Sequence, residues 1–424
     1  MYHHCKFFLL LFLLQLLGGQ SINNAIGLGA PRDLTSASAF GVGSSGLIPS
    51  FSEGIALENP VTWSNGKFAL LSGGFSGEQI SLGNDAGGNG FSDLNRVQLI
   101  LPIKNIYALG IAVVPLTNSN YWLKNEPTSL TVNDDTLSIL QEIKGSGGIN
   151  ALRVAFGFPI TDHEKNAITL QILFGSSRHN SILDIEGTKY IYSRHDSYSG
   201  VYLKYYIYTN RFNVSNLPIS LYGSIGLTLQ SLALKSDQYH LFEDLNNNGY
   251  YDYLFDYPYM TETETKTEKL YSRIQKPFSV ELGYDMELKS HFHILGEISG
   301  QTFNNELPYR LSPLAGSAYN SSIHFNLGAI KFARTIPRAW YQNFHYRMGF
   351  YFDSKDLQRY QDNLIETGLS LGIGLKFGVT NNQIDLAYSY AKRQGPLTTA
   401  NEIIERFKIQ MTIGDIWFVK RRAR

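Results

Sequence analysis

The nine residues from Phe344 to Phe352, FHYRMGFYF, alternate strictly between two kinds of side chain. In an extended chain, one face carries the apolar residues Phe344, Tyr346, Met348, Phe350 and Phe352. The opposite face carries His345, Arg347, Gly349 and Tyr351. A period of two is the mark of a β-strand that presents one apolar face and one polar face, so this stretch predicts a strand.

The same alternation recurs along the chain, in residues 278–288, 368–377 and 407–413 and in about a dozen further segments. The count predicts fourteen to sixteen strands, and fourteen strands in residues 67–424 leave about 26 residues for each strand and its connection, which suits an antiparallel membrane barrel. In such a barrel the charged residues of the polar faces line the lumen, where pairing with one another is their simplest role. These residues are Arg153, Lys204, Glu281, Asp285, Glu297, Arg347, Lys376, Asp385, Arg406 and Lys408.

The composition limits the class of protein. Thirty-six basic residues balance 36 acidic ones, which argues against a nucleic-acid partner held by phosphate contacts. Charged residues make up 17% of the chain and aromatic residues 13%, and after residue 21 no apolar run is long enough for a membrane helix. A soluble sandwich or propeller also alternates. Aromatic residues at segment ends instead favour a transmembrane barrel with interfacial girdles: Tyr107, Tyr121, Trp122, Tyr190, Tyr192, Trp340 and Trp417.

Residues 1–21 have the pattern of a cleaved secretory signal, with Lys6 before an apolar run and small residues at its end. A buried N-terminal helix is the alternative. Cys5, the single cysteine, lies within this segment, so the mature chain is expected to contain neither disulfides nor thiolate metal sites. A signal peptide followed by an all-β transmembrane barrel predicts the bacterial outer membrane as the location.

Residues 22–66 do not alternate and are rich in Gly, Ser and Ala, yet they carry more apolar residues than a solvated tail usually does. We expect an N-terminal plug inside the barrel formed by residues 67–424, with a disordered tail as the alternative. The segment ends in Glu58-Asn59-Pro60-Val61. Further on, the stretches YALGIAVVPLTNSNYWL and FKIQMTIGDIWFVKRRAR begin at Tyr107 and Phe407.

These three stretches resemble the FadL-like family of outer-membrane transporters for long-chain fatty acids and other hydrophobic compounds, and its PorV-like relatives associated with type IX secretion. The chain departs from the family at Val61, where the family has Ala. The resemblance implies a plug and an interrupted wall through which an apolar ligand leaves sideways. Asn59, Pro60 and Pro115 are the expected gate residues, since a proline removes a hydrogen bond from a strand ladder. The alternative is that Asn59-Pro60 is only a turn before the first strand.

The longest insertion, residues 236–269, is expected to form an extracellular loop. Within it Asp244, Asn246, Asn248 and Asp252 have the spacing of an EF-hand-type loop, which predicts a structural calcium site over residues 244–256. Phe255 stands where the twelfth ligand belongs, so an Asn/Gly turn is the alternative. His291 and His293 share one face of a strand as a candidate metal pair, without a third ligand that the sequence identifies.

No nucleophile motif or phosphate-binding loop accompanies these residues, and we predict that the protein is not an enzyme and has no other cofactor. The predicted function is diffusion of long-chain fatty acids or other hydrophobic small molecules across the outer membrane, with membrane lipid as the surroundings. The competing hypothesis is a PorV-like barrel that binds protein partners of a secretion system. A structural barrel with neither activity is the third hypothesis.

Overall fold

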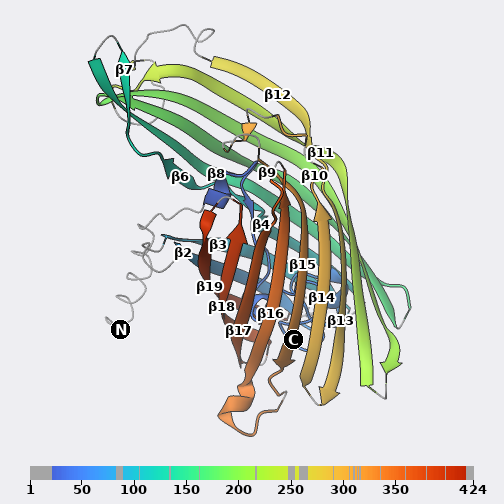
Figure 1. Cartoon of the computed structure of the whole chain (residues 1–424). Coiled ribbons are helices and arrows are strands. Elements are labelled where there is room, and N and C mark those ends of the chain that lie inside the picture. The colour runs from blue at the N-terminus through green and yellow to red at the C-terminus, as the bar shows by residue number, and fades with distance from the viewer. Residues whose placement is uncertain are drawn as a thin grey trace, which may run out of the picture.

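The computed structural model describes residues 22–416, except for 83–88, 105, 133–134, 162, 215–216, 247–253, 257–265, 290, 305, 309–310, 313, 315–316, 335, 359, 379 and 397. The predicted signal peptide, residues 1–21, and Trp417 lie outside this range. Within it the chain forms a closed antiparallel barrel (Figure 1). No helix among the described residues has the length and apolar character needed to cross a bilayer.

The strands are antiparallel, and those of the wall follow one another around the ring in chain order, while β5 (Thr117–Asn118) is not part of the ring. Their bounds are β2 (Ala69–Leu82), β3 (Asn89–Ile103), β4 (Tyr107–Pro115), β5 (Thr117–Asn118), β6 (Tyr121–Lys124), β7 (Thr128–Val132), β8 (Asp135–Pro159), β9 (Glu164–Ile185), β10 (Thr188–Val214), β11 (Leu217–Glu243), β12 (Lys266–Gln275), β13 (Phe278–Lys289), β14 (Phe292–Thr302), β15 (Tyr319–Lys331), β16 (Phe344–Leu357), β17 (Leu364–Phe377), β18 (Asn382–Gly395) and β19 (Thr398–Asp415). The short 3-10 helix η5 (Trp340–Asn343) precedes β16.

These strands fill fourteen positions around the described wall. β4, β6 and β7 follow one another along the same neighbour, β8. In the same way β12 and β13 pair with successive parts of β11, on either side of Lys276 and Pro277. The ring closes where β19 pairs with β2, from Asp415↔Ala69 to Glu402↔Leu82. The predicted barrel of about fourteen strands is therefore confirmed.

The alternation predicted from Phe344–Phe352 is present in β16, where Met348 is 60% exposed and the neighbouring Arg347 is 3% exposed. Large apolar side chains are exposed on strand after strand around the ring, as a lipid-facing belt requires. One predicted girdle residue is wrong. Tyr121 is 1% exposed and faces inward, where its hydroxyl bonds the ring of His179 at 2.7 Å.

Inside the ring lies the segment 22–66, which we call the plug. It contains η2 (Ile22–Ala25), β1 (Ala30–Pro31), α2 (Ala37–Phe40) and η3 (Pro60–Asn65). Apolar plug residues pack against apolar inward residues of the wall, as Phe51 and Trp63 do against Leu70 and Ile100. The predicted boundary between residues 66 and 67 falls in the connection between η3 and β2.

Strands β8 to β11 are much longer than the about ten residues that cross a bilayer, and β10 and β11 each contain 27 residues. Irregular positions lie on one line across them: Gly147 and Gly148 with positive φ in β8, Gly175 in β9, and the register shift at Ser199/Val201 in β10. Beyond this line the strands rise past the rest of the barrel (Figure 1). We call this part, with β6, β7 and β12, the extension.

The extension changes the bounds of the predicted insertion 236–269. β11 continues to Glu243 and β12 begins at Lys266, so both ends of that range are strand and pair with each other, as Asp237↔Glu268 shows. Sequence alternation continued into the insertion because the two strands continue beyond the membrane belt.

Candidate functional site

Buried polar side chains of the wall bind the backbone of the plug. Arg347 of β16 donates hydrogen bonds to the carbonyl oxygens of Ser50 at 2.9 Å and Phe51 at 3.3 Å. The same guanidinium pairs with Asp385 of β18 at 2.6 Å, and both side chains are fully buried. Gln383 adds a bond to the carbonyl oxygen of Phe51 at 3.0 Å. These bonds fix the plug, because moving it would leave its buried carbonyl oxygens and their donors on Arg347 and Gln383 unpaired.

A second anchor lies on β14, which is separated from β16 by β15 alone. Glu297 accepts hydrogen bonds from the backbone N–H of Leu47 at 3.0 Å and from the hydroxyl of Ser45 at 2.8 Å. The plug is therefore bonded to several strands of this part of the wall.

The predicted gate residues Asn59 and Pro60 lie at the start of η3. The side-chain oxygen of Asn59 accepts from the N–H of Val61 at 3.2 Å, which caps the helix, and its amide donates to the carbonyl of Leu47 at 2.7 Å. Pro60 occupies the first turn, where a missing N–H costs nothing. Its carbonyl oxygen packs on Gly157 of β8. The motif thus forms a capped turn inside the plug, and a gating role for it stays a prediction.

Between the plug and the wall the lumen contains a cavity of about 340 Å³. Ionisable side chains of both signs line it, including Asp33, Lys204, Glu281, Glu366, Arg393 and Arg406. Several of them pair with one another, as Arg393 and Glu366 do at 2.8 Å. The predicted mixed-charge lumen is confirmed. Such a lining opposes the axial passage of an apolar molecule, since the molecule would displace water from charged groups without replacing its hydrogen bonds.

The hydrogen-bonded ladder between β3 and the next strand of the wall ends near Pro115, the last residue of β4. β3 pairs with β4 from Ile103↔Tyr107 to Val97↔Val113. No described residue of β3 that precedes Val97 in the chain pairs with β5, β6 or β7. Over that stretch, Asn89–Arg96, the partner of β3 is β2 alone. Pro115, the third predicted gate residue, therefore lies where the strand parts from β3.

The plug reaches into this interruption. Its strand β1 pairs with β5, with Ala30 opposite Asn118 and Pro31 opposite Thr117. β5 therefore has a plug strand as its partner where β3 is missing. The pair holds further through the hydroxyl of Thr117, which donates to the carbonyl of Leu28 at 3.1 Å.

Arg32 connects the two sides of the interruption. Its backbone N–H donates to the carbonyl of Leu116, just after β4, at 2.9 Å. Its guanidinium forms a two-pronged ion pair with Asp93 of β3 and lies 5.7 Å from the ring centre of Phe91. Arg32 thus bonds both to the β4–β5 side and to the β3 side, and it is the feature of the plug that sequence reasoning missed.

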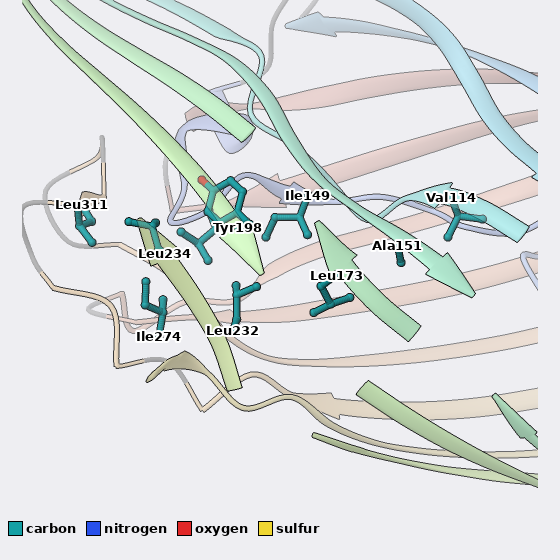
Figure 2. Close-up of a cluster of buried hydrophobic side chains, with 10 residues drawn as sticks. Val114, Ile149, Ala151, Leu173, Tyr198, Leu232, Leu234, Ile274 and Leu311 are labelled. Carbon is teal, nitrogen blue, oxygen red and sulfur yellow. The ribbon is translucent and has the colours of Figure 1, made fainter. Parts of the chain in front are cut away.

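Next to the interruption lies a buried apolar cluster on the inner side of the bent strands (Figure 2). Its members come from the wall, the plug and the β14–β15 connection: Leu28, Val114, Ile149, Ala151, Leu173, Tyr198, Leu232, Leu234, Ile274 and Leu311. Val114 is the residue directly before Pro115. The lumen therefore has an apolar region beside the break in the wall, apart from its charged cavity.

The calcium prediction falls only partly on described residues. Asn248 and Asp252 lie outside them. Asp244 is buried, and its backbone N–H donates to the carbonyl of Lys189 at 3.1 Å. Asp256, which follows Phe255, is also buried and accepts from the N–H of Leu245 at 3.2 Å. The calcium site at Asp244, Asn246, Asn248 and Asp252 thus stays a prediction, as does the alternative turn.

A closed fourteen-position barrel with an apolar exterior, a plug and an interrupted wall defines a FadL-like outer-membrane barrel, and the chain is a protein of the bacterial outer membrane. The family model BamG matches residues 10–423, and the chain belongs to the BamG family. No curated protein matches the sequence.

Solved structures share the fold at low sequence identity. They include the CymD monoaromatic hydrocarbon channel, 11% identical with a TM-score of 0.55 over 92% of this chain and 100% of that one. A Pseudomonas aeruginosa FadL homologue is 13% identical, with a TM-score of 0.57 over 91% of this chain and 99% of the other. The Pseudomonas putida toluene transporter TodX is 10% identical, with a TM-score of 0.51 over 90% and 98%. Two of the three are named as a channel and a transporter.

Proposed function

We propose that this protein lets hydrophobic small molecules diffuse from its lumen sideways into the outer membrane, with long-chain fatty acids as the ligand class. The observation that carries the proposal is the break between β3 and the β4–β6 side at Pro115, covered from inside by plug strand β1. Leu94 and Val97 of β3 are exposed beside this break, so an apolar molecule that leaves through it meets an apolar outer surface.

The lining of the lumen supports the sideways route. Straight passage meets the charged cavity and the plug anchors at Arg347 and Glu297, where an apolar solute gains nothing. The apolar cluster around Val114 and Leu173 lies beside the break instead. An apolar molecule that enters along the inner face of the extension meets this cluster before it meets the break.

The names of the similar structures support a hydrophobic small molecule as the cargo. One is a monoaromatic hydrocarbon channel and another a toluene transporter. Both names describe apolar cargo, and the choice of fatty acid over a smaller hydrocarbon is the finer part of the proposal.

A disulfide that locks β1 to β5 tests the route. Ala30 and Asn118 are paired residues of antiparallel strands, whose Cα atoms lie about 4.5–5.5 Å apart, which is within disulfide range. The variant Ala30→Cys/Asn118→Cys is made in the mature chain, which lacks Cys5. Uptake of a radiolabelled long-chain fatty acid, and of toluene, is measured in cells that depend on this protein. We expect the oxidised lock to lower fatty-acid uptake about tenfold or more and reduction to restore it.

The matched control is Thr302→Cys/Ser321→Cys, a paired position of β14 and β15 away from the break. It should oxidise without effect on uptake. Equal uptake by the oxidised and reduced β1–β5 lock would overturn the sideways route. Equal uptake of fatty acid and toluene would remove the fatty-acid preference.

The extension favours a second candidate function, the binding of protein partners. Among the described residues β7 pairs only with β8, and β12 only with β11, so each leaves a strand edge unpaired. Unpaired edges accept an added strand from another chain. Native mass spectrometry of the protein extracted gently from its own membrane distinguishes the two functions. A stoichiometric protein without apolar ligand supports partner binding, and a bound fatty acid without a protein supports the channel.

A further inference from the structure

At the end of the barrel with the shorter turns, two acids and a histidine from separate parts of the chain lie together. They are Glu53 of the plug, Glu287 of β13 and His293 of β14, and one potential ligand atom from each lies within 4.8 Å of the other two. Glu287 and His293 are directly opposite each other across the β13–β14 pair. Their Cα positions are therefore fixed by the wall, and Glu53 approaches from the plug.

The histidine is prepared to act as a ligand. His293 is 6% exposed, and its Nδ1 lies 2.9 Å from a carboxylate oxygen of Asp285. A carboxylate only accepts, so Nδ1 carries the proton of the neutral ring and Nε2 carries the lone pair. Nε2 is buried without a hydrogen-bond partner. A carboxylate that orients a histidine through its second nitrogen is the usual support of a metal-binding histidine.

The two acids lack a fixed counter-charge. Among the described residues no Lys or Arg forms an ion pair with Glu53 or Glu287, and Glu53 pairs with His291, whose Nδ1 lies 3.0 Å from its Oε2. Two carboxylates beside an imidazole that can remain neutral leave a region of negative potential. Such a region favours a bound cation.

We propose that Glu53, Glu287 and His293 bind one divalent transition-metal ion, with zinc as the best match. Two carboxylate oxygens and one imidazole nitrogen, completed by water, form a common zinc ligand set, whereas calcium and magnesium prefer oxygen alone. The ion would fasten the Ser52–Ile55 turn of the plug to the β13–β14 hairpin. Asp285 and His291 act as positioning residues for this site.

The site can close on an ion of this size. Ligand atoms at about 2.1 Å from zinc in tetrahedral geometry are about 3.4 Å apart, so atoms within 4.8 Å need to approach by about 1.4 Å at most. The Glu53 side chain is 47% exposed and can rotate inward. The same exposed side gives the ion a path from solvent.

Zinc binding to the full mature protein tests the proposal. The protein is purified in detergent without a polyhistidine tag, treated with a chelator and dialysed, and titrated with Zn²⁺ by calorimetry. We expect one ion per chain. Glu53→Gln and His293→Gln should each weaken binding about tenfold or more, and Asp285→Asn about tenfold. His324→Gln is the matched control, since the Nε2 of His324 is also buried without a partner, but His324 has no such pair of acids.

A second measurement reports on the plug. Zn²⁺ should slow amide exchange of residues 50–56 in the wild type and have no effect in Glu53→Gln, whose exposed position makes misfolding a poor explanation. The faster gel migration of unheated barrel confirms folding of every variant. Absence of zinc binding in the wild type, or equal binding by His293→Gln, overturns the proposal.

Discussion

At Gly349, in the middle of β16, the backbone of the plug touches the wall directly. A Cβ atom at this position would lie 2.2 Å from the carbonyl carbon of Val42 and 2.3 Å from the nitrogen of Gly43. The neighbouring Arg347 holds the plug by hydrogen bonds. On the same inward face, Gly349 thus lets the plug backbone come close and Arg347 binds it. Close approach puts the plug carbonyls of Ser50 and Phe51 within reach of the guanidinium.

Gly349→Ala should therefore loosen the plug. The added methyl forces the Val42–Gly43 backbone away from β16, and overpacking of this kind costs about 1–3 kcal/mol. Limited proteolysis of the folded protein should show faster cleavage within residues 36–50. Gly300→Ala on β14, where nothing lies within 4 Å of the added atom, is the control. Equal cleavage of the two variants would mean that the plug does not depend on this contact.

Some of the residue contacts could be predicted from the sequence and others could not. Alternation alone placed Arg347 and Asp385 on inward faces, because the side-chain period of a strand is fixed. The partners of Arg347 were beyond prediction, since its contacts with Ser50 and Phe51 join positions almost 300 residues apart. His293 was recognised as half of a pair, but its neighbour Glu53 is a single acid in a segment without periodicity.

At the scale of elements, the break in the wall depends on β1 and β5, two strands of two residues each. A period of two needs at least four residues to be seen, so neither strand had a signal in the sequence. Tyr121 was misplaced for a related reason: β6 has four residues, and their register is set by pairing with β8 instead of by a long alternation. The proline at position 115 was the one local sign that the strand changes its course.

Arg32→Gln should weaken the closure of the break. The substitution removes the ion pair with Asp93 and keeps the backbone bond to Leu116, so β1 stays paired while β3 is released. Loss of this partly exposed ion pair should raise the population of the state in which the break between β3 and β5 is open. We therefore expect uptake to increase about two- to fivefold. Fatty-acid uptake checks this, with Arg338→Gln, an exposed substitution near η5, as the control. A fall in uptake would identify Arg32 as a ligand contact instead of a latch.

At the scale of the whole molecule, strand number and the mixed-charge lumen followed from the sequence, because residues per hairpin and side-chain period are geometric constants of membrane barrels. The extension did not. Strands that continue beyond the bilayer alternate as those inside it do, so the sequence shows no boundary at the bend. The glycines at 147, 148 and 175 mark it only once the strands are aligned.

Acid should release the plug. Burial of Asp33 opposes its ionisation, but Lys408 at 3.2 Å and hydrogen bonds from Thr35 and Ser44 outweigh burial and hold the pKa of this carboxyl well below its usual range. In the unfolded chain the pKa of Asp33 is about 4, so at pH values above 4 the lowered pKa in the folded protein stabilises the plug. This contribution to stability is lost progressively as the pH falls below 4.

Amide exchange of residues 30–45, corrected for its intrinsic dependence on pH, should accelerate between pH 5 and about pH 2.5. Asp33→Asn should remove most of this dependence and exchange faster already at neutral pH. A wild type whose plug exchanges at the same rate over this range would show that the Asp33–Lys408 pair does not hold it.

The seam between β2 and β19 constrains how the molecule is made. Ala69 pairs with Asp415, so the ring closes only when the two ends of the wall meet, and the plug precedes β2 in the chain. The N–H of Ala37 in the plug donates to Gln410 of β19, the last strand, at 2.9 Å. The plug can therefore form this contact only after the last hairpin has folded, and it must already lie inside the ring when β19 pairs with β2. Contacts so distant in sequence form slowly, so the plug, which is synthesised before the wall, is among the last parts to reach its native place.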